Sequence, residues 1–131
     1  MNLETWSRVD NYLSDLLIEN DPILDEVLVS STKAGLPPHN VSPLQGKFLY
    51  LLTQIRGAKS ILEIGTLGAY SSIWFARALP ESGKIITIEA DPSHADVAKL
   101  NIQRSGLSRK IDLRIGKAID ICKRTIRAIF C

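Results

Sequence analysis

Two acidic residues of this chain stand at the ends of successive apolar runs, and a glycine-bearing turn follows the first of them. Glu63 lies in the run 60–64 and is followed by Gly65, while Glu89 ends the run 84–89. In a parallel sheet the ends of such runs meet at one edge, where cofactors bind. Two carboxylates suit the hydroxyl groups and ammonium of a nucleoside-like ligand, whereas a phosphate prefers backbone N–H groups and cations. We therefore expect a nucleoside-like cofactor there.

Each of these candidate residues also has a purely structural explanation. Glu63 could form an ion pair with a basic residue of the core, because an unpaired buried carboxylate is costly. Gly65 could serve only as a turn residue, and Thr66 and Ser71 could cap the following helix. Glu89 could be a capping or surface acid, but it lies 24 residues after Gly65. That spacing fits an acid that binds ribose hydroxyls in a dinucleotide fold.

Three helices are predicted in the first part of the chain. Aspartate or serine followed by proline is typical of a helix start, and this pattern occurs at 21–22 and 42–43. Glycine beyond a helix end is also typical, and Gly35 and Gly57 occupy such places. The third helix carries an apolar stripe of Leu44, Phe48, Leu51, Leu52 and Ile55. The predicted helices cover about residues 5–18, 22–33 and 43–56.

Strands and helices alternate in the rest of the chain. Strands are predicted at about 60–64, 84–89 and 110–115, and helices at about 70–78 and 92–105. This order indicates an α/β fold with a mostly parallel sheet.

The end of the chain departs from this alternation. Only a short helix is predicted after Gly116, through Cys122, and the last nine residues do not continue the pattern. A doubly wound sheet needs a fourth strand beside the first, so we expect an exposed apolar edge on the strand 60–64.

Composition narrows the class of protein. The chain has 131 residues, with 45% hydrophobic and 23% charged, as expected for one globular domain. A net charge of +2 does not indicate binding to nucleic acid or to an anionic membrane. No apolar run is long enough to cross a bilayer, and residues 1–6 do not resemble a secretion signal. Cys122 and Cys131 are expected to be reduced thiols of a cytoplasmic protein, and His39 and His94 to be surface residues.

The motifs together resemble one known family. Residues 35–38, 41–47, 57–66, 70–74, 89–92 and 116–118 are similar to those of the cation-dependent class I S-adenosylmethionine O-methyltransferases. Catechol and caffeoyl-CoA O-methyltransferases belong to this group, and the resemblance covers about residues 3–120. It implies a Rossmann-like methyltransferase fold with an incomplete parallel sheet of about three strands and N-terminal helices. It also implies methyl transfer from S-adenosylmethionine to a hydroxyl group of a small, catechol-like acceptor, with Mg²⁺ in the full-length relatives.

The same resemblance implies a role for particular residues in binding the cofactor. It assigns Val41 to a backbone contact, Glu63, Gly65 and Thr66 to the methionine part and the turn, Ser71 to the methionine carboxylate, Glu89 to the ribose hydroxyls and Ala118 to the adenine.

Two departures from the family pattern limit what the resemblance implies. The family has glycine before the Tyr-Ser pair, whereas this chain has Ala69, preceded by Gly68. If Ala69 adopts a positive φ, the turn is strained by about 1–2 kcal/mol. The metal ligands of the family lie at the tip of a fourth strand and later, and this sequence has no counterpart for them. We therefore assign no catalytic and no metal residues, and expect a C-terminally truncated or frameshifted product with negligible turnover alone.

The predicted organisation is a single incomplete methyltransferase domain over residues 1–131. It comprises an N-terminal helical arm (1–40), a cofactor-binding half (41–120) and an atypical tail (121–131). The alternative function is a non-catalytic cofactor-binding or dimerising fragment, whose N-terminal helices either form a homodimer contact or only cover the sheet. A nicotinamide-binding oxidoreductase is disfavoured, because the spacing from Gly65 is G-x-x-G and a dinucleotide site requires G-x-G-x-x-G.

Overall fold

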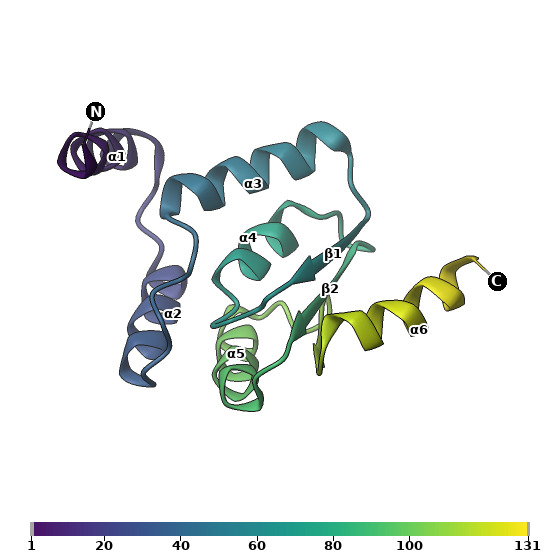
Figure 1. The fold of residues 1–131 in the computed structure, drawn as a ribbon. Helices are drawn as coiled ribbons and strands as arrows, with labels where there is room; N and C mark the ends of the chain where they lie inside the picture. Colours follow the sequence, from purple (N-terminus) through teal and green to yellow (C-terminus); the bar gives the residue numbers. More distant parts are fainter. Residues whose placement is uncertain (1, 131) are drawn as a thin grey trace.

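The order of helices and strands follows the predicted order along the chain. A computed structural model describes the backbone of residues 2–130 and the side chains of residues 2–124. Its elements are α1 (Leu3–Leu17), α2 (Pro22–Lys33), α3 (Pro43–Arg56), β1 (Ser60–Ile64), α4 (Tyr70–Ala78), β2 (Lys84–Glu89), α5 (Pro92–Ser105), β3 (Ile111–Ile115) and α6 (Ala118–Phe130) (Figure 1).

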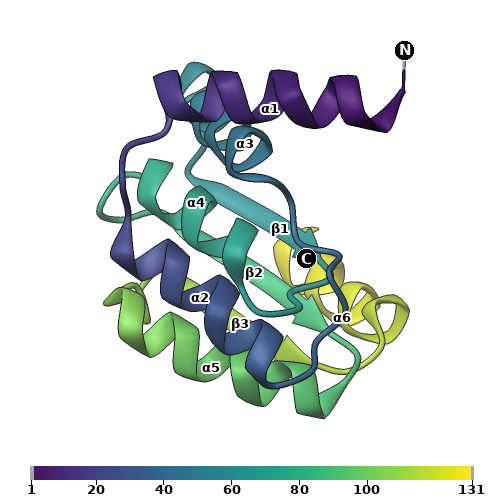
Figure 2. The ribbon, with the colours of Figure 1, turned by 90° about the vertical axis from the view of Figure 1, so that its left-hand side faces the viewer.

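The strands form a parallel sheet in the order β1-β2-β3, with Ile61 opposite Ile85 and Ile85 opposite Ile111. Helices α4 and α5 lie on one side of this sheet, with α2 outside them, and α6 lies on the other side (Figure 2). The core fills the space between the sheet and α4 and α5, where Ile73 and Ile102 are buried against the strands. The fold is therefore an α/β, Rossmann-like arrangement with an incomplete parallel sheet, as predicted.

Strand β1 is an edge strand in the described part of the chain. It pairs with β2 alone there, and its residues Leu62 and Ile64 are 48% and 66% exposed. These two side chains alternate with Ile61 and Glu63, so they lie on the face of the sheet away from α4 and α5. The predicted exposed apolar edge is thus confirmed.

The last helix differs from its prediction, because it does not stop near Cys122. Helix α6 extends from Ala118 to Phe130, which covers most of the tail that we expected to be atypical. Apolar residues at 119, 122, 126 and 129 follow helical spacing, which is consistent with a helix longer than the predicted one. Cys122 is a free, half-buried thiol, and Cys131 lies outside the described residues. No helix among the described residues is both long and apolar enough to cross a membrane.

Helices α1 and α3 leave most of their apolar residues exposed. Helix α1 has no buried residue and packs against α3. The buried residues of α3 are Thr53 and Gly46, which lies against Trp74 of α4, whereas most residues of the predicted apolar stripe are exposed. Ile55, for example, is 82% exposed. These two helices therefore offer an apolar surface that the described chain does not cover.

Asp21 connects the start of α2 to the end of α4. As the N-cap of α2 it accepts hydrogen bonds from the backbone N–H groups of Ile23 and Leu24, each at 3.1 Å. Its carboxylate also forms an ion pair with Arg77. Burial acts to raise the pKa of Asp21, but the hydrogen bonds and the charge of Arg77 outweigh burial and lower this pKa.

We expect Asp21→Asn to reduce the free energy of unfolding by about 1 kcal/mol at neutral pH, since it removes the ion pair but keeps a good N-cap. The folded pKa of Asp21 is below its unfolded value, so the contribution is fully present above about pH 4 and disappears as the pH falls through the folded pKa. Urea unfolding of both proteins at several pH values measures the difference. A difference that persists unchanged at pH 2 would contradict the assignment.

Candidate cofactor site

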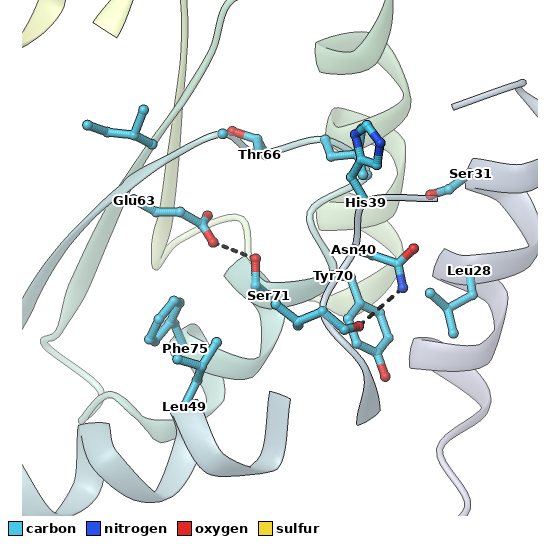
Figure 3. A pocket seen from close by; sticks show the side chains of 15 residues that line it. Leu28, Ser31, His39, Asn40, Leu49, Glu63, Thr66, Tyr70, Ser71 and Phe75 are labelled. Carbon is cyan, nitrogen blue, oxygen red and sulfur yellow. Dashed lines mark hydrogen bonds between the residues drawn. The ribbon is translucent and has the colours of Figure 1, made fainter. Parts of the chain in front are cut away.

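A pocket of about 270 Å³ lies at the carboxyl end of β1, between the turn that follows this strand and the start of α4. Helix α2 and the loop that precedes α3 form its other walls (Figure 3). The predicted cofactor residues that line it are Val41, Glu63, Gly65, Thr66 and Ser71.

The carboxylate of Glu63 is surrounded by hydroxyl groups. It accepts hydrogen bonds from Ser71 at 2.5 Å, from Thr87 at 2.6 Å and from Ser72. The hydroxyl group of Thr87 also lies 2.7 Å from that of Thr66. Among the described residues, the hydrogen-bond partners of the Glu63 carboxylate are thus hydroxyl groups and not the basic core residue of the alternative explanation. The site presents a negative charge to the pocket, which suits a ligand ammonium group.

Glu89 supports the turn instead of forming the pocket wall. Glu89 is buried, with 8% of the residue exposed. One carboxylate oxygen accepts hydrogen bonds from the backbone N–H groups of Thr66 at 3.1 Å and Leu67 at 2.8 Å. The other oxygen accepts one from Asp91 at 3.0 Å and lies 3.8 Å from His94. The sequence pattern indicated a ligand contact for Glu89 and could not reveal this second role. Each carboxylate oxygen can accept further hydrogen bonds.

The turn between β1 and α4 contains residues in the left-handed region. Leu67 has φ = 51° and Ala69 has φ = 68°, so the strain anticipated at Ala69 is present. Gly68 is needed for a different reason. A Cβ atom on this residue would lie 2.1 Å from the Ser31 hydroxyl oxygen, so glycine allows α2 to approach the turn closely. Gly68, one position earlier than the glycine of the family pattern, therefore allows α2 to pack closely against the turn. The strained backbone conformation falls on Ala69.

Ala118 lies outside the pocket, at the start of α6 and beyond the tip of β3. The tips of β2 and β3 are adjacent, because the backbone N–H of Gly116 donates to the carbonyl of Glu89 at 2.8 Å. The structure therefore separates the predicted cofactor residues into a pocket group and a strand-tip group that comprises Glu89 and Ala118.

The pocket wall also contains residues that were not among the predicted cofactor residues. His39 is exposed, as expected, but it lines the pocket beside Asn40. Tyr70 both packs in the core and lines the pocket, and burial raises the pKa of its hydroxyl group. His94, predicted to be a surface residue, is partly exposed at the start of α5 and outside the pocket, and its ring nitrogens lie 3.8 Å from carboxylate oxygens of Glu89 and Asp91. No local pattern in the sequence places the loop before α3 at the tip of β1, so only the fold reveals that His39 and Asn40 line the pocket.

The site does not provide a recognisable metal centre. Within the part of the chain that the structure describes, no group of three or more histidine, cysteine or acidic residues could hold a metal ion. The described residues therefore do not fit the divalent ion that the family resemblance implies.

A parallel sheet with a carboxylate and a glycine turn at its carboxyl edge is typical of Rossmann-like domains, whose ligands bind at this edge of the sheet. The model of the O-methyltransferase family matches residues 14–128. The chain belongs to the O-methyltransferase family.

Similar proteins agree with this assignment. A catechol O-methyltransferase of Niastella koreensis is 52% identical, over 96% of this chain and 57% of its own length. A catechol O-methyltransferase of Mycobacterium tuberculosis is 44% identical, over 86% of this chain and 51% of its own. A structure of the O-methyltransferase from Bacillus cereus in complex with S-adenosylhomocysteine (SAH) matches this chain with a TM-score of 0.94 and 51% sequence identity. The match covers 96% of this chain and 57% of the Bacillus cereus chain. The chain spans about half the length of these relatives.

Proposed function

We propose that this chain binds S-adenosylmethionine and forms the cofactor-binding part of an enzyme that methylates a hydroxyl group of a small, catechol-like acceptor. The observation that carries the proposal is the pocket beside the glycine turn, where three hydroxyl groups hold the Glu63 carboxylate. Two relatives support it, since the Bacillus cereus enzyme was solved with SAH and the Streptomyces achromogenes enzyme TomG with SAM.

The proposed binding mode divides the cofactor between the two groups of residues. Small-molecule pockets commonly measure about 300–1,000 Å³, so a pocket of about 270 Å³ suits only part of the cofactor. We place the methionine part there, with its ammonium near Glu63, its carboxylate near Ser71 and a backbone contact at Val41. The nucleoside then extends over the strand tips, with the ribose at Glu89 and the adenine beside Ala118.

In this proposal the residues of the chain bind and orient the methyl donor. When bound, the cofactor would supply an electrophilic methyl group: the acceptor oxygen would bond to the methyl carbon as the carbon–sulfur bond breaks, with S-adenosylhomocysteine as the leaving group and the hydroxyl proton passing to solvent. Glu63 and Ser71 fix the methionine part, and the turn held by Glu89 fixes the direction in which the sulfonium faces. Such positioning supplies much of the rate enhancement of a two-substrate reaction.

We expect negligible turnover from the 131-residue chain alone, because its described residues offer no group that fits the divalent ion. That ion would bind the acceptor oxygens and lower the pKa of the reacting hydroxyl group. Incubation of the purified chain with S-adenosylmethionine, catechol and Mg²⁺, followed by chromatography of the products, tests this expectation. Detectable methylated catechol that depends on Mg²⁺ would contradict it.

Thermal unfolding in the presence of S-adenosylhomocysteine tests the proposed binding. Ligand at 100 times its Kd stabilises a folded protein by about 2.7 kcal/mol, which raises the melting temperature by several degrees. We expect this rise for the unmodified chain and a smaller one for Ser71→Ala, which removes a pocket hydroxyl. Ser105→Ala in α5, outside the pocket, serves as the control and is expected to respond fully. An equal response from Ser71→Ala would exclude Ser71 from the site.

A second candidate function, a dimerising module, is favoured by the exposed apolar residues of α1 and α3. Trp6, Tyr12 and Leu16 of α1 are exposed, as are Phe48 and Ile55 of α3. Exposed apolar surface of this kind commonly marks a protein contact. We propose that a second copy of the chain covers it.

We expect size-exclusion chromatography at two concentrations to show a shift toward the dimer at the higher one, and Leu16→Glu to abolish the shift. Asp10→Lys, a charge change on α1, serves as the control, since Asp10 is not one of its apolar residues. A monomer at both concentrations would leave cofactor binding as the only proposed role.

The absence of nucleic-acid partners and a cytoplasmic location stay predictions.

A further inference from the structure

Asn101 is a fully buried polar residue behind the pocket, in the middle of α5. Its side chain is 0% exposed and does not line the pocket. Its amide nitrogen donates a hydrogen bond to the carbonyl oxygen of Gly68 at 2.9 Å. Its amide oxygen accepts one from the hydroxyl group of Ser30 at 2.7 Å and one from Arg104 at 3.2 Å. One side chain therefore links the glycine turn, α2 and α5.

The groups that Asn101 connects belong to two walls of the pocket. Gly68 lies in the turn wall, and Ser31, the neighbour of Ser30, lies in the α2 wall. The two walls are close enough that any side chain at Gly68 would meet the Ser31 hydroxyl. Asn101 therefore lies where it can fix the distance between these walls.

The chemistry at this point requires an amide group. One neighbour is an acceptor, the Gly68 carbonyl, and the other is a donor, the Ser30 hydroxyl. An amide supplies a donor and an acceptor together, whereas a carboxylate supplies acceptors only and an apolar side chain supplies neither. A buried amide is costly unless it is satisfied, so a residue that only filled the core would be better replaced by an apolar one.

We propose that Asn101 is a positioning residue for cofactor binding, which holds the Gly68 carbonyl and α2 in the arrangement that shapes the pocket. This inference rests on the proposed function, since the ligand is S-adenosylmethionine or its product. Asn101 acts through Gly68 and Ser30 and has no contact with the ligand itself.

Calorimetric titration with S-adenosylhomocysteine tests the proposal, at a temperature where circular dichroism shows each variant fully folded. Asn101→Asp keeps the shape but loses the donor to Gly68, and we expect its affinity to fall about tenfold, as for one lost buried hydrogen bond. Ser30→Ala keeps the bond to Gly68 and is expected to lose less affinity. Ser105→Ala, on the same helix but away from the turn, is the control and should bind like the unmodified chain.

Hydrogen exchange supplies a readout that needs no ligand. We expect the amides of Leu67 and Ala69 in the turn to exchange faster in Ser30→Ala and Asn101→Asp, while the amide of Ile88 in β2 keeps its rate. A purely structural role would instead raise exchange evenly over the core. Because Ser30 is only half-buried, Ser30→Ala keeps the test usable if Asn101→Asp does not fold.

The outcomes separate the two proposals. Weaker binding with selective exchange in the turn supports the positioning role. Unchanged affinity in the Asn101 variant and in Ser30→Ala, or a uniform rise in exchange, overturns it even if the unmodified chain binds. If the unmodified chain does not bind, the proposed function fails, and the exchange comparison alone decides whether Asn101 holds the turn.

Discussion

Replacing Gly46 with alanine is expected to reduce the free energy of unfolding by roughly 2–3 kcal/mol, the upper range for overpacking a core. A Cβ atom on Gly46 would lie 2.2 Å from the indole nitrogen of Trp74 and 2.4 Å from its Cδ1 atom. Both distances are far below van der Waals contact, so either the indole ring or helix α3 must move.

Neither movement is easy in this fold. Trp74 is buried in the core and packs edge-to-face against Tyr50, with ring centroids 6.3 Å apart. Helix α3 contacts α4 more extensively than it contacts any other helix of the described chain. Alanine is favoured over glycine in a helix by about 1 kcal/mol, which offsets only part of the cost.

A double-mutant cycle attributes the loss to this contact. The variants are Gly46→Ala, Trp74→Leu and their combination, with urea unfolding as the measurement. We expect Gly46→Ala to cost much less when Trp74 is already leucine, which gives a coupling of about 1 kcal/mol or more. Additive effects would show that the two residues do not meet and would contradict the packing of α3 on α4.

The second large effect is expected from Glu89→Gln, which should lower stability by about 2 kcal/mol and weaken binding of S-adenosylhomocysteine by tenfold or more. Glutamine has nearly the same shape, so the change isolates the chemistry of the carboxylate. An amide offers one acceptor oxygen and one donor nitrogen, whereas both oxygens of Glu89 accept hydrogen bonds.

The double loss follows from the two tasks of Glu89. If the amide nitrogen faces the turn, a hydrogen-bond donor meets the donor N–H groups of Thr66 and Leu67, and both hydrogen bonds to the turn are lost. If the amide nitrogen faces the other way, it meets the donor N–H of Asp91, and that hydrogen bond is lost. The turn lines the proposed methionine pocket, and the remaining lone pairs of Glu89 are proposed to bind the ribose. Both consequences reduce affinity.

Glu81→Gln provides a matched control, since Glu81 is almost fully exposed in the loop before β2. Urea unfolding and calorimetric titration of both variants give the two quantities. We expect Glu81→Gln to change neither one measurably. A Glu89→Gln variant that loses affinity at unchanged stability would show that Glu89 binds ligand without supporting the turn. Loss of stability at unchanged affinity would remove Glu89 from the proposed site.

Local signals predicted most of the fold. The N-cap of α2 at Asp21 and the capping box of α3 at Ser42 and Gln45 are as expected from their spacing. The ends of the strands near Glu63 and Glu89 were also predicted, because an acidic residue in an apolar run indicates where a buried strand reaches its tip. The length of α6 was underestimated, although its apolar spacing was present in the sequence.

The contacts that hold the turn were not predictable from the sequence. Asn101 bonds to Gly68 across 33 positions and to Ser30 across 71, and nothing local marks it as different from any polar residue on a helix. The second role of Glu89 and the place of His39 in the pocket wall likewise depend on the packing of distant segments. Such pairs become visible only when the chain is folded.

The most direct test of the account is calorimetric titration of the unmodified 131-residue chain with S-adenosylhomocysteine. We predict saturable one-to-one binding, because the pocket, the turn and the tips of β2 and β3 are formed within this chain. The absence of binding by a chain shown to be folded by circular dichroism would contradict it. The chain would then belong to the O-methyltransferase family, but its pocket and strand-tip residues would not form a functional cofactor site.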